Sequence, residues 1–393
     1  MKKILIVTPT LRSGGGVIRG LQNMLSLLPK GKYDIDVLPL GYSGRDNVEL
    51  ENCTVLKVSF LLTATDGVYG ECENYRYKAI LWFCKVLLAL LHKLKLRDVV
   101  VTWLHKLVSC SYKGYDVVVA YQEGAATHFV QHIKTPHRIA WIHCDYAEYY
   151  KCHNYKSEEP IYGKYSDIVC VSDYTLKRFQ EIYPSLNKCS LYIYNLLDIS
   201  MITQSSLANF DDVRGGNGAV QLISIGRLHY VKQFFLIPSI ISKIIKRGVT
   251  NFTWILLGSG DTLEHQRIME EVKKYNVSAY FRYLGPKQNP YPYIAASDVL
   301  VSTSSSEACP FVVNEARVLG VPVVSNNYPS ISEFINDGVN GRICTISEMA
   351  CVLSELISNR EVLDCLKEGM KADEYKNEVI VTKICNLFDG VES

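Results

Sequence analysis

The sequence predicts an α/β protein of two domains, each built on a Rossmann-like parallel sheet. Its 393 residues exceed what one hydrophobic core usually organises, and chains of this length commonly divide into about two domains. Short apolar runs alternate with helical patterns on both sides of a polar stretch near residue 200, which indicates βαβ units. Hydrophobic residues make up 48% and charged residues 21%, so the composition favours a globular protein over a disordered or fibrous one.

The first half of the chain supplies the apolar runs of one expected sheet. A helix is expected between the first two runs, at about 17–28. Because β-branched runs separated by helices are typical of parallel strands, we expect a single parallel sheet here. The runs are KILIVTP, YDIDVLPLG, YDVVVAY, RIAWIHC, SDIVCVS and CSLYIYN.

A polar segment separates this half from a second alternating half. Residues 196–220 are rich in Ser, Asn, Asp and Gly without a sustained period, which is typical of a linker. The alternation then restarts with VQLISIG, FTWILLG, YFRYLG, DVLVSTS, VPVVSN and GRIC. We therefore expect domains at 1–195 and 221–393 with a cleft between them, and the last helix is a candidate to pack back on the first domain.

The charges are distributed unevenly between the two halves. Residues 1–195 carry 24 Lys and Arg against 18 Asp and Glu, a net of +6, whereas 196–393 carry 18 against 22, a net of −4. This asymmetry indicates an anionic partner for the first half, either a membrane surface or a phosphorylated substrate. The thirteen cysteines are never spaced as CxxC, which favours reduced thiols in a cytosolic protein. We expect no signal or transit peptide, because MKKILIVTPT runs directly into a strand.

The segment 75–107 departs from the alternating scheme. It has a helical pattern rich in Leu and Trp, and no acidic residue occurs from 75 to 97. Its apolar runs are too short to span a membrane, which takes about 20 residues. Two interpretations remain open: an amphipathic surface that contacts a membrane interface, or a helix pair that covers the sheet and exposes a solvated basic face. The basic residues are Arg76, Lys78, Lys85, Lys93, Lys95 and Arg97.

Ligands of parallel α/β sheets bind at the carboxyl ends of strands, and three motifs lie at such turns. The first is Gly14, Gly15 and Gly16, after the strand that ends at Pro9. Glycines before a helix let backbone amides approach a ligand, and the helix amino terminus favours negative charge. The alternative is an ordinary tight turn, because the motif matches neither GxGxxG nor Walker A.

The second motif follows the strand that ends at Gly226. Arg227 comes next, and Lys232 lies five residues further on, at the start of the next helical pattern. Two cations directed into one strand-to-helix turn suit a diphosphate, the guanidinium by bidentate geometry and the ammonium as a point charge. The alternative is a pair of solvated surface residues.

The third motif is a pair of glutamates in an otherwise apolar stretch. Glu307 lies in a loop before a helix that Pro310 is well placed to open, and Glu315 lies within that helix. The pair is placed to hold two parts of one extended ligand, while the amides near Phe311 and Val312 face its phosphate. Taken singly, Glu307 has the alternative of a helix-dipole acid, and Glu315 that of an exposed helix residue.

Together these motifs resemble the donor-site signature of the retaining glycosyltransferases of family 4, which have the GT-B fold of two Rossmann-like domains facing across a cleft. The signature consists of Gly226, Arg227 and Lys232, followed by Glu307 and Glu315 with seven residues between them. Blocks of the first half agree, and they look most like members that assemble bacterial surface polysaccharides. The resemblance covers essentially the whole chain, with 60–110 the least matched part. The blocks are the glycine-rich first turn, YDVVVAYQEGAATHFV with Glu123 and Gly124, RIAWIHCDY with His143 and Asp145, and YNLLD.

The resemblance implies a role for each matching residue. Arg227 and Lys232 would neutralise the donor diphosphate, Glu315 would bind the ribose, and Glu307 would bind hydroxyls of the donor sugar. His143 would face that sugar near its anomeric carbon, although a histidine at a strand end is by itself more often structural. The remaining implied contacts are backbone amides to the phosphates, from Gly15, Gly16, Phe311 and Val312. One departure concerns donor-sugar identity, because ACP stands at 308–310 where many relatives have Gly-Phe-Gly or Gly-Leu-Pro.

The expected chemistry requires neither a metal nor a cofactor. Cleavage of the bond to a nucleoside diphosphate develops negative charge on phosphate, which preorganised cations stabilise. The only DxD string, Asp34 to Asp36, opens an expected strand and so lies at the wrong edge of the sheet for a metal diphosphate site. The resemblance further implies retention of anomeric configuration, and no covalent nucleophile stands out.

The expected partners are a nucleotide sugar, with UDP favoured, and a saccharide acceptor, which would be lipid-diphosphate-linked if 75–107 touches the inner face of the cell membrane. Two other functions stay open: a GT-B-type epimerase or phosphorylase, and a non-catalytic sugar-nucleotide-binding subunit. The first lacks signals for extra acid and base carboxylates or a cofactor lysine. The second would be expected to have lost one signature residue. Nucleic acid is disfavoured, because the basic residues form no stripe with aromatics.

Overall fold

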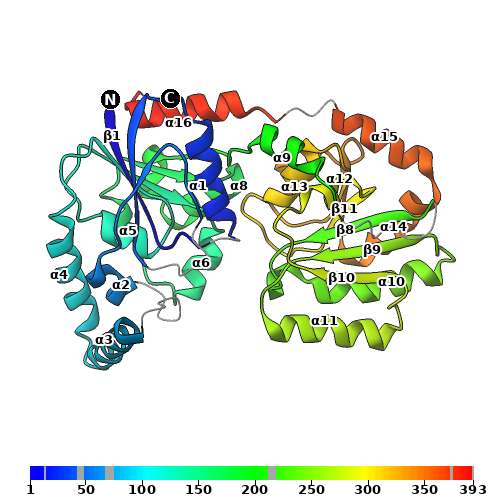
Figure 1. Cartoon of the computed structure of the whole chain (residues 1–393), viewed down its shortest axis with the longest axis horizontal. Coiled ribbons are helices and arrows are strands. Elements are labelled where there is room, and N and C mark those ends of the chain that lie inside the picture. Colours follow the sequence, from blue (N-terminus) through cyan, green and yellow to red (C-terminus); the bar gives the residue numbers. More distant parts are fainter. Residues whose placement is uncertain (13–14, 42–47, 67–74, 211–217, 372–374, 392–393) are drawn as a thin grey trace. The chain divides into compact units, whose positions relative to one another are not determined.

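The computed structural model describes residues 1–12, 15–41, 48–66, 75–210, 218–371 and 375–391. It divides into two compact units, one formed by Met1–Leu197 with Asn377–Ser393 and the other by Asp198–Lys376. Each unit contains one parallel sheet with helices packed around it (Figure 1). Gly14 of the first glycine turn lies outside the described residues.

The first unit has a seven-stranded sheet in the order β3-β2-β1-β4-β5-β6-β7, with every pairing parallel. Its strands are β1 (Lys2–Thr8), β2 (Tyr33–Pro39), β3 (Thr54–Val55), β4 (Val117–Ala120), β5 (His137–Ile142), β6 (Asp167–Cys170) and β7 (Ser190–Tyr192). Its helices are α1 (Gly16–Leu27), α2 (Phe60–Asp66), α3 (Tyr75–Lys93), α4 (Arg97–Ser109), α5 (Ala125–Val130), α6 (Tyr146–Cys152), α7 (Glu159–Tyr162), α8 (Asp173–Ile182), η2 (Pro184–Cys189) and α16 (Asn377–Asp389).

The second unit has a six-stranded parallel sheet in the order β10-β9-β8-β11-β12-β13. Its strands are β8 (Val220–Ile225), β9 (Phe252–Leu257), β10 (Phe281–Gly285), β11 (Val299–Ser302), β12 (Val323–Asn326) and β13 (Gly341–Cys344). Its helices are α9 (Ile199–Ser206), η3 (Tyr230–Lys232), η4 (Phe234–Leu236), α10 (Ile237–Lys246), α11 (Thr262–Tyr275), α12 (Tyr291–Ala295), α13 (Phe311–Val318), η5 (Ile331–Glu333), α14 (Ile346–Ser358) and α15 (Arg360–Lys371).

The central strands are buried on both faces, which explains their continuous apolar runs. All four residues of β4 are buried, as are all six of β9, as expected for parallel sheets covered by helices on both sides. The first core is centred on β1, β4, β5 and β6 with side chains from α5 to α8. The second is centred on β8, β9 and β11 with α10, α11 and α14. Among the helices that the structure describes, none is long and apolar enough to cross a membrane.

The segment 196–220, expected to be a linker, contains the helix α9. Asp198 caps this helix by accepting a hydrogen bond from the Met201 amide at 2.9 Å. Ile202 is buried, and the Ser205 carbonyl accepts a hydrogen bond of 2.8 Å from the Asn289 amide group. The helix has eight residues, which is too short to impose a visible period on the sequence.

The last helix, α16, belongs to the first unit. Phe388 is fully buried and packs edge-on against Tyr33, with ring centroids 5.6 Å apart. The Lys2 ammonium donates to the Phe388 and Asp389 carbonyls at 3.2 and 2.7 Å. These are the last carbonyls of the helix, which a cation stabilises.

Candidate functional site

Two of the three motifs meet at the carboxyl edge of the second sheet. Strands β8 and β11 are parallel neighbours, so the loops that follow them emerge at the same edge. Hydrogen bonds join the loops: the Thr303 hydroxyl donates to the Lys232 carbonyl at 2.6 Å, and the Ser305 amide and hydroxyl donate to the Val231 carbonyl at 2.8 and 3.2 Å. The topology thereby brings residues 75 positions apart in sequence into contact.

Lys232 and Glu307 form an ion pair in this edge, and both side chains are largely buried. The Ser304 hydroxyl donates to the same carboxylate oxygen at 2.7 Å. The Ser330 hydroxyl holds the Glu307 backbone by donating to its carbonyl at 2.7 Å. Interaction with the dipole of the following helix therefore does not by itself account for Glu307, because its carboxylate also binds a lysine from another loop.

Arg227 stands apart from this pair. Its side chain is exposed, and no ion pair joins it to another residue in the described part of the chain. The guanidinium is thus accessible to an anion at the end of β8, and diphosphate binding by Arg227 stays a prediction.

The loop after β8 lies directly on the loop after β9, a contact that the sequence analysis missed. The Leu228 amide donates to the Ser259 carbonyl at 3.0 Å. Gly258 has a φ of +143°, and a Cβ there would lie 1.8 Å from the Gly226 carbonyl oxygen. The two loops can approach only because residue 258 has no side chain. The sequence signal that could have predicted this contact is the GSG that follows the FTWILL run, because glycines after a strand allow close approach of another backbone.

Glu315 is buried rather than exposed, so the alternative of an exposed helix residue is wrong. Only 1% of its surface is accessible, and the Tyr291 hydroxyl donates to its Oε1 at 3.3 Å. A carboxylate is rarely buried without a binding or structural role. Its neighbour on α13, Asn314, is also buried, so this face of the helix points into the unit.

The amino terminus of α13 presents free backbone amides close to Glu307. The helix is capped by Pro310, and no described side chain caps it. Phe311 and Val312 occupy its first two positions, where amides have no partner within the helix. Such a terminus favours an anion, and phosphate binding by these two amides stays a prediction.

The first glycine turn places a second helix terminus at the edge of the other sheet. Gly15 caps α1 and Gly16 is its first residue, without a side-chain cap among the described residues. Gly15 has a φ of −104°, and a Cβ there would meet nothing within 4 Å. Packing against the described residues therefore does not require a glycine at this position.

His143 lies in the first unit, in the loop after β5, next to the loop after β4. Its backbone amide donates to the Glu123 carboxylate at 2.9 Å. Its Nε2 atom is buried and makes no hydrogen bond within the described residues. Burial lowers the pKa of His143 to about 3, against a smaller opposing effect of a hydrogen bond with the Tyr121 backbone. Burial likewise raises the pKa of Glu123, which backbone hydrogen bonds partly offset.

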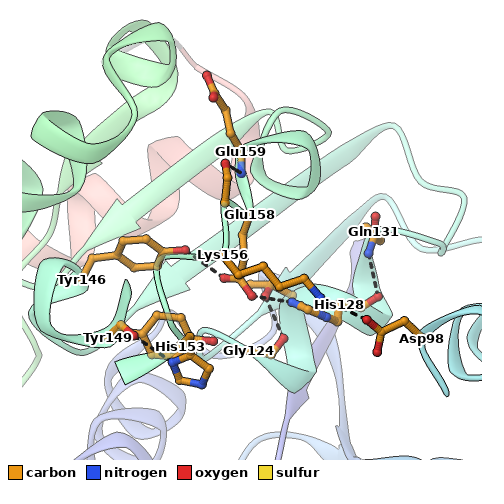
Figure 2. A network of polar contacts seen from close by, with 12 residues as sticks. Asp98, Gly124, His128, Gln131, Tyr146, Tyr149, His153, Lys156, Glu158 and Glu159 are labelled. Atoms are coloured by element: carbon orange, nitrogen blue, oxygen red, sulfur yellow. Dashed lines mark hydrogen bonds and ion pairs between the residues drawn. The ribbon is translucent and has the colours of Figure 1, made fainter. Parts of the chain in front are cut away.

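A buried carboxylate, Glu158, lies between His128 and Tyr146, close to Gly124 (Figure 2). It binds the His128 imidazole at 2.6 Å and accepts from the Tyr146 hydroxyl at 2.8 Å. Burial alone would raise the pKa of Glu158, but the hydrogen bonds and the charge of His128 lower it overall. The Gly124 carbonyl accepts from the His128 amide at 2.9 Å. The sequence offered no signal for this network, because Glu158 lies in a polar segment.

Two partly buried histidines, His132 and His143, predict acid destabilisation. The pKa of His143 is about 3 and that of His132 about 4, both lowered mainly by burial, whereas an unfolded histidine titrates near 6.5. Between these values the unfolded state binds protons that the folded state does not. Stability is therefore complete above about pH 6.5 and falls as the pH drops toward 4, by at most about 1.4 kcal/mol per pH unit for each histidine.

Urea unfolding between pH 7.5 and 4.5 measures this slope. The variant His143→Gln is expected to have a shallower dependence of the free energy of unfolding on pH than the parent chain. A slope that is unchanged by the substitution would contradict the burial argument for His143.

Comparison with known proteins finds a family model that is similar to the second unit. Residues 219–359 match the family model described as "Glycosyl transferases group 1". This range begins just before β8 and contains every site residue described above for that unit.

The DxD string from Asp34 to Asp36 lies at the amino end of β2, in the first unit. There Asp36 accepts a hydrogen bond from the Tyr115 hydroxyl at 2.6 Å.

Two curated relatives are similar to parts of the chain. The chain is 32% identical over 124 residues to the amylovoran biosynthesis glycosyltransferase AmsD of Erwinia amylovora, which is 31% of this chain and 33% of the relative. It is 25% identical over 234 residues to N-acetyl-alpha-D-glucosaminyl L-malate synthase of Bacillus anthracis, 58% of this chain and 60% of the relative. The matches thus span one third to three fifths of these two relatives.

A solved structure covers nearly the whole chain. HepE of Anabaena in complex with UDP-glucose aligns with a TM-score of 0.68 at 16% identity, over 99% of this chain and 100% of that one. At this identity the likeness concerns the fold alone. The chain has the GT-B fold, as two parallel-sheet α/β domains of seven and six strands.

Proposed function

We propose that this chain is a retaining glycosyltransferase that moves a hexose or N-acetylhexosamine from a nucleotide sugar to a saccharide acceptor. The product is proposed to belong to a bacterial surface polysaccharide, in line with the similarity to the lipopolysaccharide core biosynthesis glycosyltransferase LpsE of Rhizobium meliloti, and UDP is the favoured nucleotide because the HepE structure holds UDP-glucose. The observation that carries the proposal is the Lys232–Glu307 pair beside the open amino terminus of α13. This arrangement places a cation, a carboxylate and free backbone amides together at the carboxyl edge of the second sheet.

The diphosphate of the donor is proposed to bind Arg227, Lys232 and the amides of Phe311 and Val312. Its two phosphates carry more negative charge than the Glu307 carboxylate that Lys232 contacts in the free protein. Lys232 is therefore shared between carboxylate and phosphate when the donor binds. As the leaving diphosphate gains charge, these preorganised groups stabilise the transition state more than the ground state.

The glutamates and the histidine are proposed to hold the rest of the donor. Glu315 binds the ribose hydroxyls, which would account for a carboxylate that is buried in the apolar face of a short helix. Glu307 binds hydroxyls of the transferred sugar. In the first unit, the neutral imidazole of His143 contacts that sugar, and the amides of Gly15 and Gly16 contact phosphate. The Nε2 atom of His143 lacks a partner among the described residues, which supports a ligand role.

The transfer is proposed to need no metal ion, because Arg227 and Lys232 supply the positive charge that the leaving group requires. The acceptor is proposed to be a saccharide on a lipid diphosphate at the cytoplasmic face of the cell membrane. Its support is the net charge of +6 in residues 1–195, which favours an anionic partner for that half.

Release of UDP from a panel of UDP-hexoses and UDP-N-acetylhexosamines, in buffer with EDTA, tests the proposed activity. One donor is expected to release UDP by slow hydrolysis without acceptor, and the proton coupling of the freed or transferred sugar is expected to show the same anomer as the donor. An inverted product, or a complete dependence on divalent cations, would overturn the proposed mechanism.

A further inference from the structure

The helices α3 and α4 expose an unusual amount of apolar surface. Of the 21 exposed large hydrophobic side chains in the described residues, eleven lie between 80 and 107. The others are scattered singly, as is normal for a protein surface. Figure 1 shows the two helices at the periphery of the first unit. The eleven, here called the hairpin face, are Ile80, Trp82, Phe83, Val86, Leu87, Leu90, Leu94, Leu96, Val99, Trp103 and Leu107.

The hairpin face contains a continuous stripe rather than a random set. Eight of its eleven members form the stripe: from Ile80 to Leu94 they recur at intervals of three and four residues, and from Val99 to Leu107 at intervals of four, so they share one side of each helix. The opposite side holds the hairpin to the unit: Leu81 is buried against Ala64 and Phe60 of α2. On α4, buried His105 binds Asp66 at 2.8 Å. The stripe comprises Ile80, Phe83, Leu87 and Leu90 on α3, Leu94 directly after α3, and Val99, Trp103 and Leu107 on α4.

Basic residues surround the tip of the hairpin. The sequence from 93 to 97 alternates cations with leucines, and Leu94 and Leu96 are 66% and 48% exposed. Lys93, Lys95 and Arg97 are also exposed. The only acidic residue from 75 to 109 is Asp98, whose carboxylate is already paired with Lys156 at 3.0 Å. An apolar stripe with cations along its border is complementary to a surface that has an anionic outer layer and an apolar layer below it.

We propose that the hairpin face binds the surface of an anionic phospholipid bilayer, with its leucines and tryptophans in the interface and the cations at lipid phosphates. A second copy of the chain is the competing occupant, because the α3 spacing also suits a coiled coil. Two copies would bring the same lysines together without an acidic residue between them, which is unfavourable. The proposal goes beyond the proposed transfer activity, since lipid binding requires no nucleotide sugar.

The native tryptophans report directly on this surface. Trp82 and Trp103 lie on the hairpin face, 54% and 61% exposed, whereas Trp141 and Trp254 are 2% and 0% exposed; these are all four tryptophans of the chain. Vesicles of one part phosphatidylglycerol to two parts phosphatidylcholine are expected to shift the emission to shorter wavelength, and bromine-labelled acyl chains to quench it. The variant Trp82→Phe, Trp103→Phe is expected to lose both responses.

A pair of matched variants separates charge from general adsorption. Replacing Lys93, Lys95 and Arg97 with glutamine is expected to weaken binding to these vesicles roughly 100-fold, because each cation near a charged membrane contributes a factor of about five. The control replaces Lys243, Lys246 and Arg247, three exposed residues at the end of α10, and is expected to bind like the parent chain.

Several results would overturn the proposal. They are the absence of binding to the phosphatidylglycerol vesicles, equal binding to pure phosphatidylcholine, and equal loss in the two triple variants. Sedimentation that shows a dimer whose dissociation follows Trp103→Glu, together with no lipid response, would assign the hairpin face to a second copy. Circular dichroism and the emission of Trp141 and Trp254 confirm that each variant is folded.

Discussion

The substitution Lys232→Ala is expected to lower the rate of sugar transfer by a factor of about 100 to 1,000, the usual cost of removing one preorganised group that stabilises a developing negative charge. Lys232 is fixed from both ends: its carbonyl accepts from Thr303 at 2.6 Å, and its ammonium contacts Glu307. Gly226 makes room for the side chain, since a Cβ there would lie 3.3 Å from the Lys232 Cε atom. Steady-state kinetics with the best UDP-sugar donor measures this effect.

A companion variant distinguishes lost catalysis from lost folding. Lys232→Ala leaves the largely buried Glu307 carboxylate with the Ser304 hydroxyl as its remaining hydrogen-bond donor among the described residues, which is expected to cost about 1–3 kcal/mol of stability. Adding Glu307→Gln should recover much of that stability without restoring transfer. The control Lys243→Ala, on the exposed surface of the same unit, should change neither property. Transfer that recovers together with stability would show that the pair is only structural.

The substitution Gly258→Ala is expected to cost about 3 kcal/mol or more of folding free energy. Its Cβ would lie 1.8 Å from the Gly226 carbonyl oxygen, and the φ of +143° is one that side chains rarely adopt. The clash is with a backbone atom, so no side-chain rotation relieves it. Overpacking of this kind and backbone strain are among the causes of the largest losses of folding free energy on single substitution.

Gly285→Ala provides the matched control for Gly258→Ala. Residue 285 also has a positive φ, +68°, but a Cβ there would meet nothing within 4 Å. Its expected cost is about 1–2 kcal/mol from backbone strain alone. Urea unfolding monitored by far-ultraviolet circular dichroism compares the two variants. Equal losses would mean that strain, and not contact between the loops after β8 and β9, determines the importance of Gly258.

The sheets could be predicted from the sequence because their strands are buried on both faces. Runs such as ILIV in β1 and WILL in β9 are fully buried, and a parallel strand covered by helices requires such continuity. The helix α9 could not be predicted in the same way. It is short, and its position depends on the cap by Asp198 and on contacts with residues far along the chain.

The candidate site was predictable where the sheet topology alone determines which residues lie close together. Lys232 and Glu307 both follow strands, so the rule that ligands bind at carboxyl ends placed them at one edge before their contact was known. The burial of Glu315 was not predictable, because it depends on Tyr291 and on how α13 packs. The same holds for the hairpin face: an amphipathic pattern does not reveal which apolar side meets the protein and which remains exposed.

Calorimetric titration with UDP and GDP, in metal-free buffer, tests the central claim most directly. The parent chain is expected to bind one of the two nucleotides, with UDP favoured, and the variant Lys232→Ala, Glu315→Ala is expected to lose that binding while remaining folded. Binding that survives in the variant would place the nucleotide elsewhere in the chain. Absence of binding to both nucleotides would contradict the account. It would favour a non-catalytic subunit that keeps the signature residues but does not bind a donor.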